Sequence, residues 1–207
     1  MLFRSPDTIL ASNTSVMPIT EIMQGLKHRE RALGTHWWNP PFLVPLVEVI
    51  GTQWTSQAAI DFTMKLHADA GKEPAHVKKD VPGFIGNRLQ HALWREAVSL
   101  VERGICDAET VDRVIKAAFG RRLAVLGPLE NADLVGTDLT LAIHKTVLPD
   151  IEHRPGPSPY LERLVAEGKL GFKSGEGFRK WSAEEQAALR AKVLQHLKKA
   201  RENDAKR

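Results

Sequence analysis

The sequence predicts an α/β sheet domain in residues 1–81, followed by an all-α helical domain in residues 82–207. Two observations support this division. From Asp7 to Lys79, short apolar runs alternate with helical patterns, as they do in the second half of a doubly wound sheet. From Pro82 onward, apolar residues recur only with helical spacing. The fold class expected is therefore a partial α/β sheet with a helical C-terminal domain.

The first part contains four expected strands and two expected helices. The strands are Thr8–Ala11, Arg31–His36, Leu43–Ile50 and Pro74–Lys78. The first helix begins near Pro18, because proline is favourable in a first helical turn, and it ends at Gly25. Thr55 or Ser56 can cap the second helix, which Gly71 closes.

The second part begins with a hinge at Asp80–Gly83, which precedes a long helix closed by Gly104. Further helices are expected after Asp107, at Pro128–Val135, at Thr137–Leu148 and after Ser158. The tail helix starts with a capping box, in which Ser182 and Glu185 each bond the other's backbone N–H.

Composition limits the classes of protein that the chain can belong to. Hydrophobic content of 43% and charged content of 26% are ordinary for a soluble globular protein, and no apolar run approaches the ~20 residues of a membrane span. Cys106 is the single cysteine, so no internal disulfide can form and a reducing cytoplasm fits. The scattered histidines predict no metal site. The basic tail has no interleaved aromatics, which favours a solvated helix face over a nucleic-acid site.

The stretch Gly34–Ile50 holds the main functional candidates. His36 ends one apolar run and Glu48 lies inside the next, twelve positions on. Between them, Asn39-Pro40-Pro41 cannot continue a strand, so a chain that turns and returns can place the two side chains together. A carboxylate beside an imidazole fixes its tautomer, as a general base requires. In the alternative interpretation, which spacing alone favours, both residues are ordinary polar strand positions.

Five stretches together resemble the 3-hydroxyacyl-CoA dehydrogenase family, and they occur in that family's order. They are Ala11–Ser15 (ASNTS), Gly34–Ile50 (GTHWWNPPFLVPLVEVI), Asp80–Arg88 (DVPGFIGNR), Gly127–Glu130 (GPLE) and Gly171–Phe178 (GFKSGEGF). The resemblance implies that residues 1–81 are the C-terminal part of a Rossmann-type NAD-binding domain. It implies that residues 82–207 are the family's all-helical C-terminal domain. It also implies NAD as the cofactor and a homodimer formed through the helical part.

The resemblance also implies roles for individual residues. The catalytic pair is His36 and Glu48, the substrate-binding residues are Ser15, Asn39 and Asn87, and the cofactor-binding residues are Asn13, Ser15 and Asn39. Without the family, Asn39 would be a turn residue and Asn87 a polar residue of a first helical turn.

The activity implied is reversible oxidation of an (S)-3-hydroxyacyl-CoA to the 3-ketoacyl-CoA, in fatty acid metabolism. An alternative remains within the superfamily. Gulonate dehydrogenase and the lambda-crystallins share the Asn-Pro-Pro, Val-Pro-Leu-Val-Glu and Gly-Pro-Leu-Glu elements, so a small hydroxy acid would also suit this sequence.

The family's glycine-rich nucleotide loop is not found in this sequence. Its only G-x-G is Gly175–Gly177, where Lys180 stands in place of the third glycine and no helix directly follows. The resemblance therefore implies an N-terminally truncated chain, which alone should bind NAD weakly because the loop's N–H groups hold the pyrophosphate. The alternative of another class is an inactive remnant that acts only as a helical dimer module.

Overall fold

The computed structural model describes residues 5 and 7–204 of the chain, which divide into two compact units. One unit comprises Met1–His91 with Leu189–Arg207, and the other comprises Ala92–Ala188. The division falls inside two helices, α3 (Gly86–Glu102) and α8 (Ala183–Asp204). The predicted fold class, an α/β sheet part followed by helices, is confirmed.

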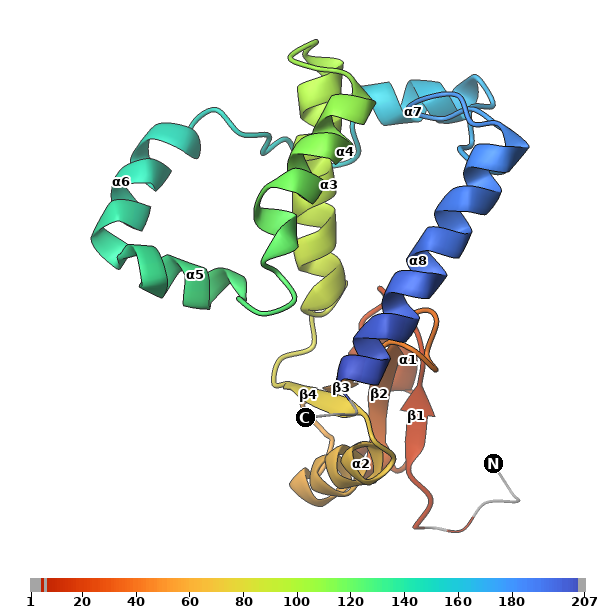
Figure 1. Ribbon diagram of the computed structural model, residues 1–207. Helices are drawn as coiled ribbons and strands as arrows, with labels where there is room; N and C mark the ends of the chain where they lie inside the picture. Colours follow the sequence, from red (N-terminus) through yellow and green to blue (C-terminus); the bar gives the residue numbers. More distant parts are fainter. Residues whose placement is uncertain (1–4, 6, 205–207) are drawn as a thin grey trace. The chain divides into compact units, whose positions relative to one another are not determined.

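The first unit contains a four-stranded sheet (Figure 1). Its strands are β1 (Leu10–Ser12), β2 (Ala32–Trp37), β3 (Leu46–Ile50) and β4 (Glu73–Val77), which lie side by side in chain order. β1 is parallel to β2 and β3 is parallel to β4, whereas β2 and β3 are antiparallel. The central antiparallel pair is the hairpin-like return that the proline loop predicted.

All four strand starts differ from the sequence prediction; β3 begins at Leu46 and not at Leu43, and β4 begins at Glu73 and not at Pro74. Residues Arg29–Arg31 form a 3₁₀ turn, so β2 begins at Ala32 and not at Arg31. β1 begins at Leu10 and not at Thr8, because Leu10 pairs with Ala32 whereas Thr8 and Ile9 have no strand partner. At the starts of β1, β3 and β4, strand pairing and not the local apolar run sets the strand end, since Leu46 and Glu73 are the first paired residues of β3 and β4.

Alternate residues of the central strands pack on opposite faces of the sheet, as period-two side-chain alternation requires. On one face, Ala32 and Ile50 pack with Ile19 and Met23 of α1 (Ile19–Met23). On the other face, Leu33, Val47 and Val49 pack with Ala59 of α2 (Gln57–Asp69). His36 and Glu48 are in step with Ala32 and Ile50, so their side chains belong to the α1 face.

The expected caps form at several helix ends. Ser56 accepts a hydrogen bond from the Ala59 N–H at the start of α2. Asp107 accepts one from the Thr110 N–H at 2.7 Å, which begins α4 (Ala108–Ala117). The capping box of α8 is confirmed: the Ser182 N–H donates to Glu185 Oε2 at 2.8 Å, and the Glu185 N–H donates to Ser182 Oγ at 3.2 Å.

The regular elements of the second unit are helices, and two isolated β-bridges, Gly171 with Glu176 and Glu176 with Lys180, lie in its glycine-rich turn. After α4 come a 3₁₀ turn at Phe119–Arg121, α5 (Pro128–Val135), α6 (Thr137–Val147) and α7 (Pro159–Ala166). α5 and α6 meet at Gly136, whose φ of 99° lies in the region that favours glycine. The two helices expected around Gly136 are confirmed.

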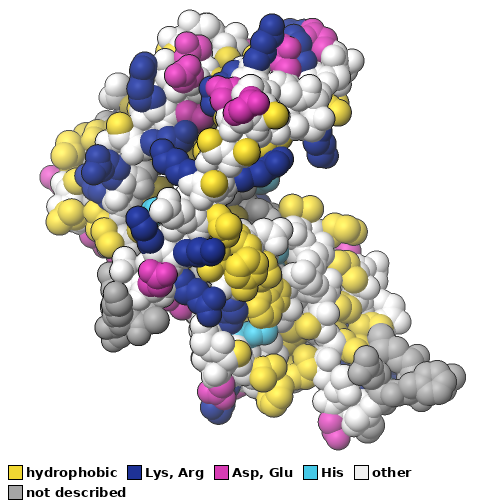
Figure 2. Space-filling view, turned by 45° about the vertical axis from the view of Figure 1, so that its right-hand side comes forward, with side chains coloured by type: hydrophobic (Ala, Val, Ile, Leu, Met, Phe, Trp, Pro, Cys, Tyr) yellow, Lys and Arg dark blue, Asp and Glu magenta, His cyan; other side chains and the backbone are white. Residues whose placement is uncertain are grey.

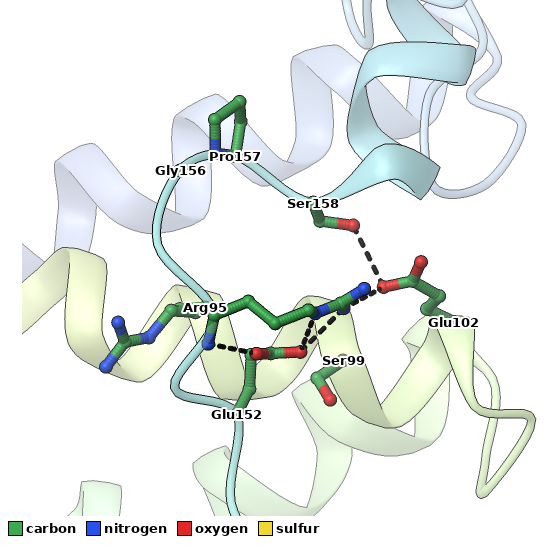
Figure 3. Close-up of a pocket in the computed structure, with 8 residues that line it drawn as sticks. Arg95, Ser99, Glu102, Glu152, Gly156, Pro157 and Ser158 are labelled. Atoms are coloured by element: carbon green, nitrogen blue, oxygen red, sulfur yellow. Dashed lines mark hydrogen bonds and ion pairs between the residues drawn. The ribbon is translucent and has the colours of Figure 1, made fainter.

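A cluster of charged groups joins α3 to the segment before α7 (Figure 3). Arg154 donates to Glu152 through Nε at 2.7 Å and to Glu102 through Nη2 at 2.8 Å. The Ser158 hydroxyl also donates to Glu102, at 3.1 Å. The Arg154 side chain and its backbone N–H lower the pKa of Glu152 to about 2. Arg154, Glu152, Glu102 and Ser158 thus satisfy one another's hydrogen bonds. We therefore interpret this cluster as a structural cross-link between α3 and the segment before α7.

This cross-link predicts how stability depends on pH. Because the folded-state pKa of Glu152 lies below its ordinary value of 4.5, its contribution is complete above pH 4.5 and is lost as the pH falls toward 2. The variant Glu152→Gln should therefore melt at a lower temperature than wild type at pH 7, and the difference should shrink between pH 4.5 and 2. Thermal unfolding at pH 7, 5 and 3 measures it. Glu162→Gln, an exposed change on α7, is the control. An unchanged difference at every pH would contradict the role of the carboxylate.

Figure 2 shows groups of hydrophobic side chains on one face of the molecule. Many hydrophobic side chains of the second unit are exposed. They include Leu129 and Leu134 of α5, Leu141 and Ile143 of α6, and Val114 of α4. None of the helices in the described part of the chain is both long enough and apolar enough to cross a membrane.

Candidate active site

The two candidate catalytic side chains lie directly opposite each other in the sheet. His36 of β2 and Glu48 of β3 are paired in the antiparallel register, and Nδ1 of His36 lies 2.7 Å from Oε2 of Glu48. Both are buried, with 3% of His36 and 1% of Glu48 exposed. A carboxylate can only accept a hydrogen bond, so Nδ1 carries the proton and Nε2 is the ring nitrogen left to accept one.

The second carboxylate oxygen of Glu48 is held by the beginning of α3. The N–H groups of Ile85 and Gly86 donate to Glu48 Oε1 at 2.9 and 3.1 Å. The first N–H groups of a helix have no partner inside the helix, and its N-terminus favours negative charge. Glu48 therefore joins the sheet to α3 while its other oxygen orients His36.

A left-handed turn aims these N–H groups at Glu48. Gly83 has φ of 75° and Phe84 has φ of 51°, which is uncommon for a residue other than glycine. Phe84 is fully buried in the α1-side core, and the Gly83 N–H donates to the Val16 carbonyl at 3.0 Å. Packing and this hydrogen bond together maintain a backbone conformation that would be costly alone.

Aromatic rings surround the imidazole. The His36 ring centroid lies 5.6 Å from that of Trp38 and 5.5 Å from that of Phe84, and both rings are tilted against it. Trp37 points to the opposite face of the sheet. There its ring centroid lies 5.1 Å from that of His67, and the two rings are nearly perpendicular. Burial, and secondarily the charge of Lys72, lowers the pKa of His67. Of the two adjacent tryptophans, Trp38 is the one beside the candidate base.

The loop between β2 and β3 is held at its backbone by two cations. Lys72 donates to the carbonyls of Pro41 and Val44, and Arg201 of α8 donates to the Phe42 carbonyl at 2.9 Å. The Asn39-Pro40 peptide bond is cis. Asn39 is exposed, and no hydrogen bond joins its side chain to another residue within the described ranges. Asn39 is therefore close to His36 in the sequence, but no hydrogen bond in the structure links its side chain to His36 or Glu48.

The other candidate residues lie in the loop after β1 and at the start of α3. Asn13 Oδ1 accepts from the Trp37 N–H at 3.3 Å, and Asn87 donates through Nδ2 to the Ser15 carbonyl at 2.7 Å. Asn87 thus ties the Ser15 loop to the helix that holds Glu48. The structure brings Asn13, Ser15 and Asn87 to the end of β1, where the carboxyl ends of the parallel strands β1 and β2 lie.

Sequence reasoning missed the two N–H groups that bind Glu48, because a backbone donor leaves no trace in residue type. The turn residues Pro82 and Gly83, a few positions before α3, were the available signal. It also missed the rings of Trp38 and Phe84 beside His36. Across residues 5 and 7–204, no group of His, Cys, Asp and Glu is arranged to hold a metal ion.

The sequence matches two family descriptions in succession. Residues 3–81 match the 3-hydroxyacyl-CoA dehydrogenase NAD binding domain, and residues 83–181 match the 3-hydroxyacyl-CoA dehydrogenase C-terminal domain.

Individual relatives agree with this pattern. The chain is 38% identical over 191 residues to 5-formyl-3-hydroxy-2-methylpyridine 4-carboxylate 5-dehydrogenase of Mesorhizobium japonicum, covering 92% of this chain and 62% of that protein. It is 40% identical over 183 residues to human mitochondrial hydroxyacyl-coenzyme A dehydrogenase, covering 86% of this chain and 56% of that protein. The chain thus spans about three fifths of the length of these relatives.

A solved structure is similar in fold. The crystal structure of a 5-formyl-3-hydroxy-2-methylpyridine 4-carboxylic acid 5-dehydrogenase, an NAD⁺-dependent dismutase, matches with a TM-score of 0.91 at 37% identity. The match covers 96% of this chain and 64% of that one.

Proposed function

The chain belongs to the 3-hydroxyacyl-CoA dehydrogenase family, a family of NAD-dependent oxidoreductases, and we propose that in the full-length protein it oxidises a hydroxyl-bearing carbon with His36 as general base. One observation carries this proposal. The buried His36 is bonded through Nδ1 to Glu48, whose other oxygen is fixed by two backbone N–H groups. This arrangement keeps Nε2 free to accept a proton and offers a negative charge to the imidazolium that results.

The residues of this chain would act as follows. His36 Nε2 takes the proton of the substrate hydroxyl while the C–O bond becomes a carbonyl. Glu48 holds the imidazole in place and stabilises its charged form. Ser15 and Asn87, which lie at the end of β1, are the proposed donors to the reacting oxygen. Asn39, from the neighbouring loop, is the third proposed substrate-binding residue.

NAD is the cofactor of this family, and when bound it accepts the hydride that leaves the substrate carbon. The donor set at the end of β1 fits the nicotinamide side of such a ligand. Asn13 and Ser15 are exposed, polar and located where strands end in loops, which is where doubly wound sheets bind their ligands. We assign Asn13, Ser15 and Asn39 to this side of the cofactor.

Two substrate classes agree with this chemistry. An (S)-3-hydroxyacyl-CoA, oxidised to the 3-ketoacyl-CoA, is the first candidate, because both halves of the chain match the family named for it. A small aromatic carboxylate bearing an oxidisable aldehyde is the second. A relative named for such a reaction matches 92% of this chain, and the hydrate of an aldehyde presents a hydroxyl to the same base.

An assay of the full-length protein tests the proposal and separates the candidates. NADH formation is followed with (S)-3-hydroxybutyryl-CoA and, in parallel, with 5-formyl-3-hydroxy-2-methylpyridine 4-carboxylate. Turnover with the thioester alone supports the first candidate, and turnover with the pyridine alone supports the second. Absence of NAD-dependent turnover with either substrate, and with L-gulonate, would contradict the proposed function and favour a non-catalytic dimer module.

We also propose that the helical part from residue 82 onward forms a homodimer. Within the second unit, exposed apolar side chains such as Leu93 on α3 and Val114 on α4 occur, and large exposed apolar patches mark association surfaces. Sedimentation velocity at micromolar concentration should therefore give twice the chain mass. Val114→Asp should shift the protein toward monomer, whereas Lys116→Asp, an exposed polar position on the same helix, should not. A wild-type monomer at these concentrations would overturn the proposal.

A further inference from the structure

We infer that Trp38 and Gly86 form a positioning pair, in which the tryptophan ring occupies the space of a missing side chain and so sets the distance between α3 and Glu48. This inference rests on the proposed function, because it concerns how His36 is held for its role. Neither residue is assigned to bind substrate or cofactor; both act on the reaction through the pair of His36 and Glu48.

The fit of the two residues is tight. A Cβ built on Gly86 would lie 2.4 Å from Trp38 Cζ2, 3.2 Å from Cε2 and 3.4 Å from Cη2. All three atoms belong to the six-membered part of the indole, which is a rigid plane and not the far end of a flexible chain. Any side chain at Gly86 would therefore require the indole, or the first turn of α3, to move.

The place of this contact links it to the catalytic pair. Gly86 is the first residue of α3, and its own N–H donates to Glu48 Oε1 at 3.1 Å. On its other side, the Trp38 ring lies 5.6 Å from the His36 ring. A side chain added at Gly86 would therefore disturb the catalytic pair in two ways. It would move the N–H donors of α3 away from Glu48, and it would push the Trp38 indole against the His36 imidazole.

Packing sets the position of the ring without help from a polar anchor. Nε1 of Trp38 is buried, and in the described part of the chain it has no hydrogen-bond acceptor. The indole is therefore located by its fit against Gly86 and His36. A steric pair of this kind predicts that the two positions can compensate for each other.

The test is a double-mutant cycle in the full-length protein. Gly86→Ala should lower kcat by about 10–100-fold while the KM values for NAD and substrate change by less than about threefold, because a misplacement near 1 Å in a catalytic group costs about this much. Adding Trp38→Phe, which removes the three atoms that meet the new methyl group, should return kcat to the level of Trp38→Phe alone. Equal kcat for Gly86→Ala and wild type, or a double variant slower than Trp38→Phe alone by the factor that Gly86→Ala costs in the wild-type background, would overturn the inference.

Controls separate this result from a folding defect and from failure of the proposed function. Gly25→Ala places a methyl group in open space and should leave kcat unchanged. Circular dichroism should show folded protein in every case, since alanine has a higher helix propensity than glycine. The proton shared by His36 and Glu48 provides a readout that needs no turnover. Its downfield NMR resonance should shift in Gly86→Ala and return in the double variant, and a resonance that is the same in all variants would overturn the inference even if no substrate is turned over.

Discussion

Replacing His36 with alanine should reduce kcat of the full-length protein by about 10²–10⁴-fold, the usual contribution of a positioned general base. The substrate hydroxyl would have to lose its proton to water, which is neither held in place nor supported by Glu48. Steady-state rates of NADH formation measure the loss. The KM for NAD should change little, because His36 is proposed to act on the substrate.

Two further variants make this result specific. His36→Gln retains a donor for the Glu48 carboxylate, so it should be as slow as His36→Ala but more stable to heat. His67→Ala removes a histidine on the opposite face of the sheet, where it contacts Trp37, and should keep kcat within a few-fold of wild type. Near wild-type turnover by His36→Ala would remove His36 from the mechanism.

Replacing Glu48 with glutamine should also lower kcat, by about 10²–10⁴-fold, through the tautomer of His36. A glutamine has one acceptor and one donor end, whereas Glu48 accepts from the Ile85 and Gly86 N–H groups at one oxygen and from His36 at the other. If the amide oxygen accepts from the two N–H groups, the NH₂ group faces His36 Nδ1. Nδ1 must then accept a hydrogen bond, and the ring proton moves to Nε2, where the base is needed.

The tautomer can be observed directly. ¹⁵N NMR of the His36 ring should show the proton on Nδ1 in wild type and on Nε2 in Glu48→Gln. Glu73→Gln, a change at the exposed start of β4, is the matched control and should alter neither the tautomer nor kcat. A fully active Glu48→Gln variant would show that orientation of His36 by a carboxylate is not required.

Local sequence rules predicted the elements of this fold because those elements depend on near neighbours. The proline loop separates the strands that carry His36 and Glu48, and Ser56, Asp107 and Ser182 cap helices as the sequence indicated. The 3₁₀ turns at Arg29–Arg31 and Phe119–Arg121 were missed, since no strong residue preference marks them. Strand ends shifted because pairing with a neighbouring strand sets them.

Only those parts of the candidate site that depend on side-chain type and spacing could be predicted from the sequence. The spacing of His36 and Glu48 allowed them to meet, and the structure places them at 2.7 Å. The contacts that complete the site span much longer stretches of chain. Glu48 meets Ile85 and Gly86 from 37 and 38 residues away, and Trp38 meets a glycine whose importance lies in the side chain it lacks. Such contacts follow from packing in three dimensions and leave no local pattern.

The antiparallel register of β2 and β3 determines which changes in chain length the catalytic pair can tolerate. His36 and Glu48 face each other across neighbouring strands, and successive residues of a strand point to opposite faces. Residues inserted into the loop at 39–44 would lengthen that loop and leave His36 and Glu48 opposite each other in the two strands. A single residue inserted between Ala32 and His36, or between Glu48 and Ile50, would turn one member of the pair toward α2 unless a bulge absorbed it. Natural or designed variants of this chain should therefore vary in length in the loop and stay constant in length in the two strands.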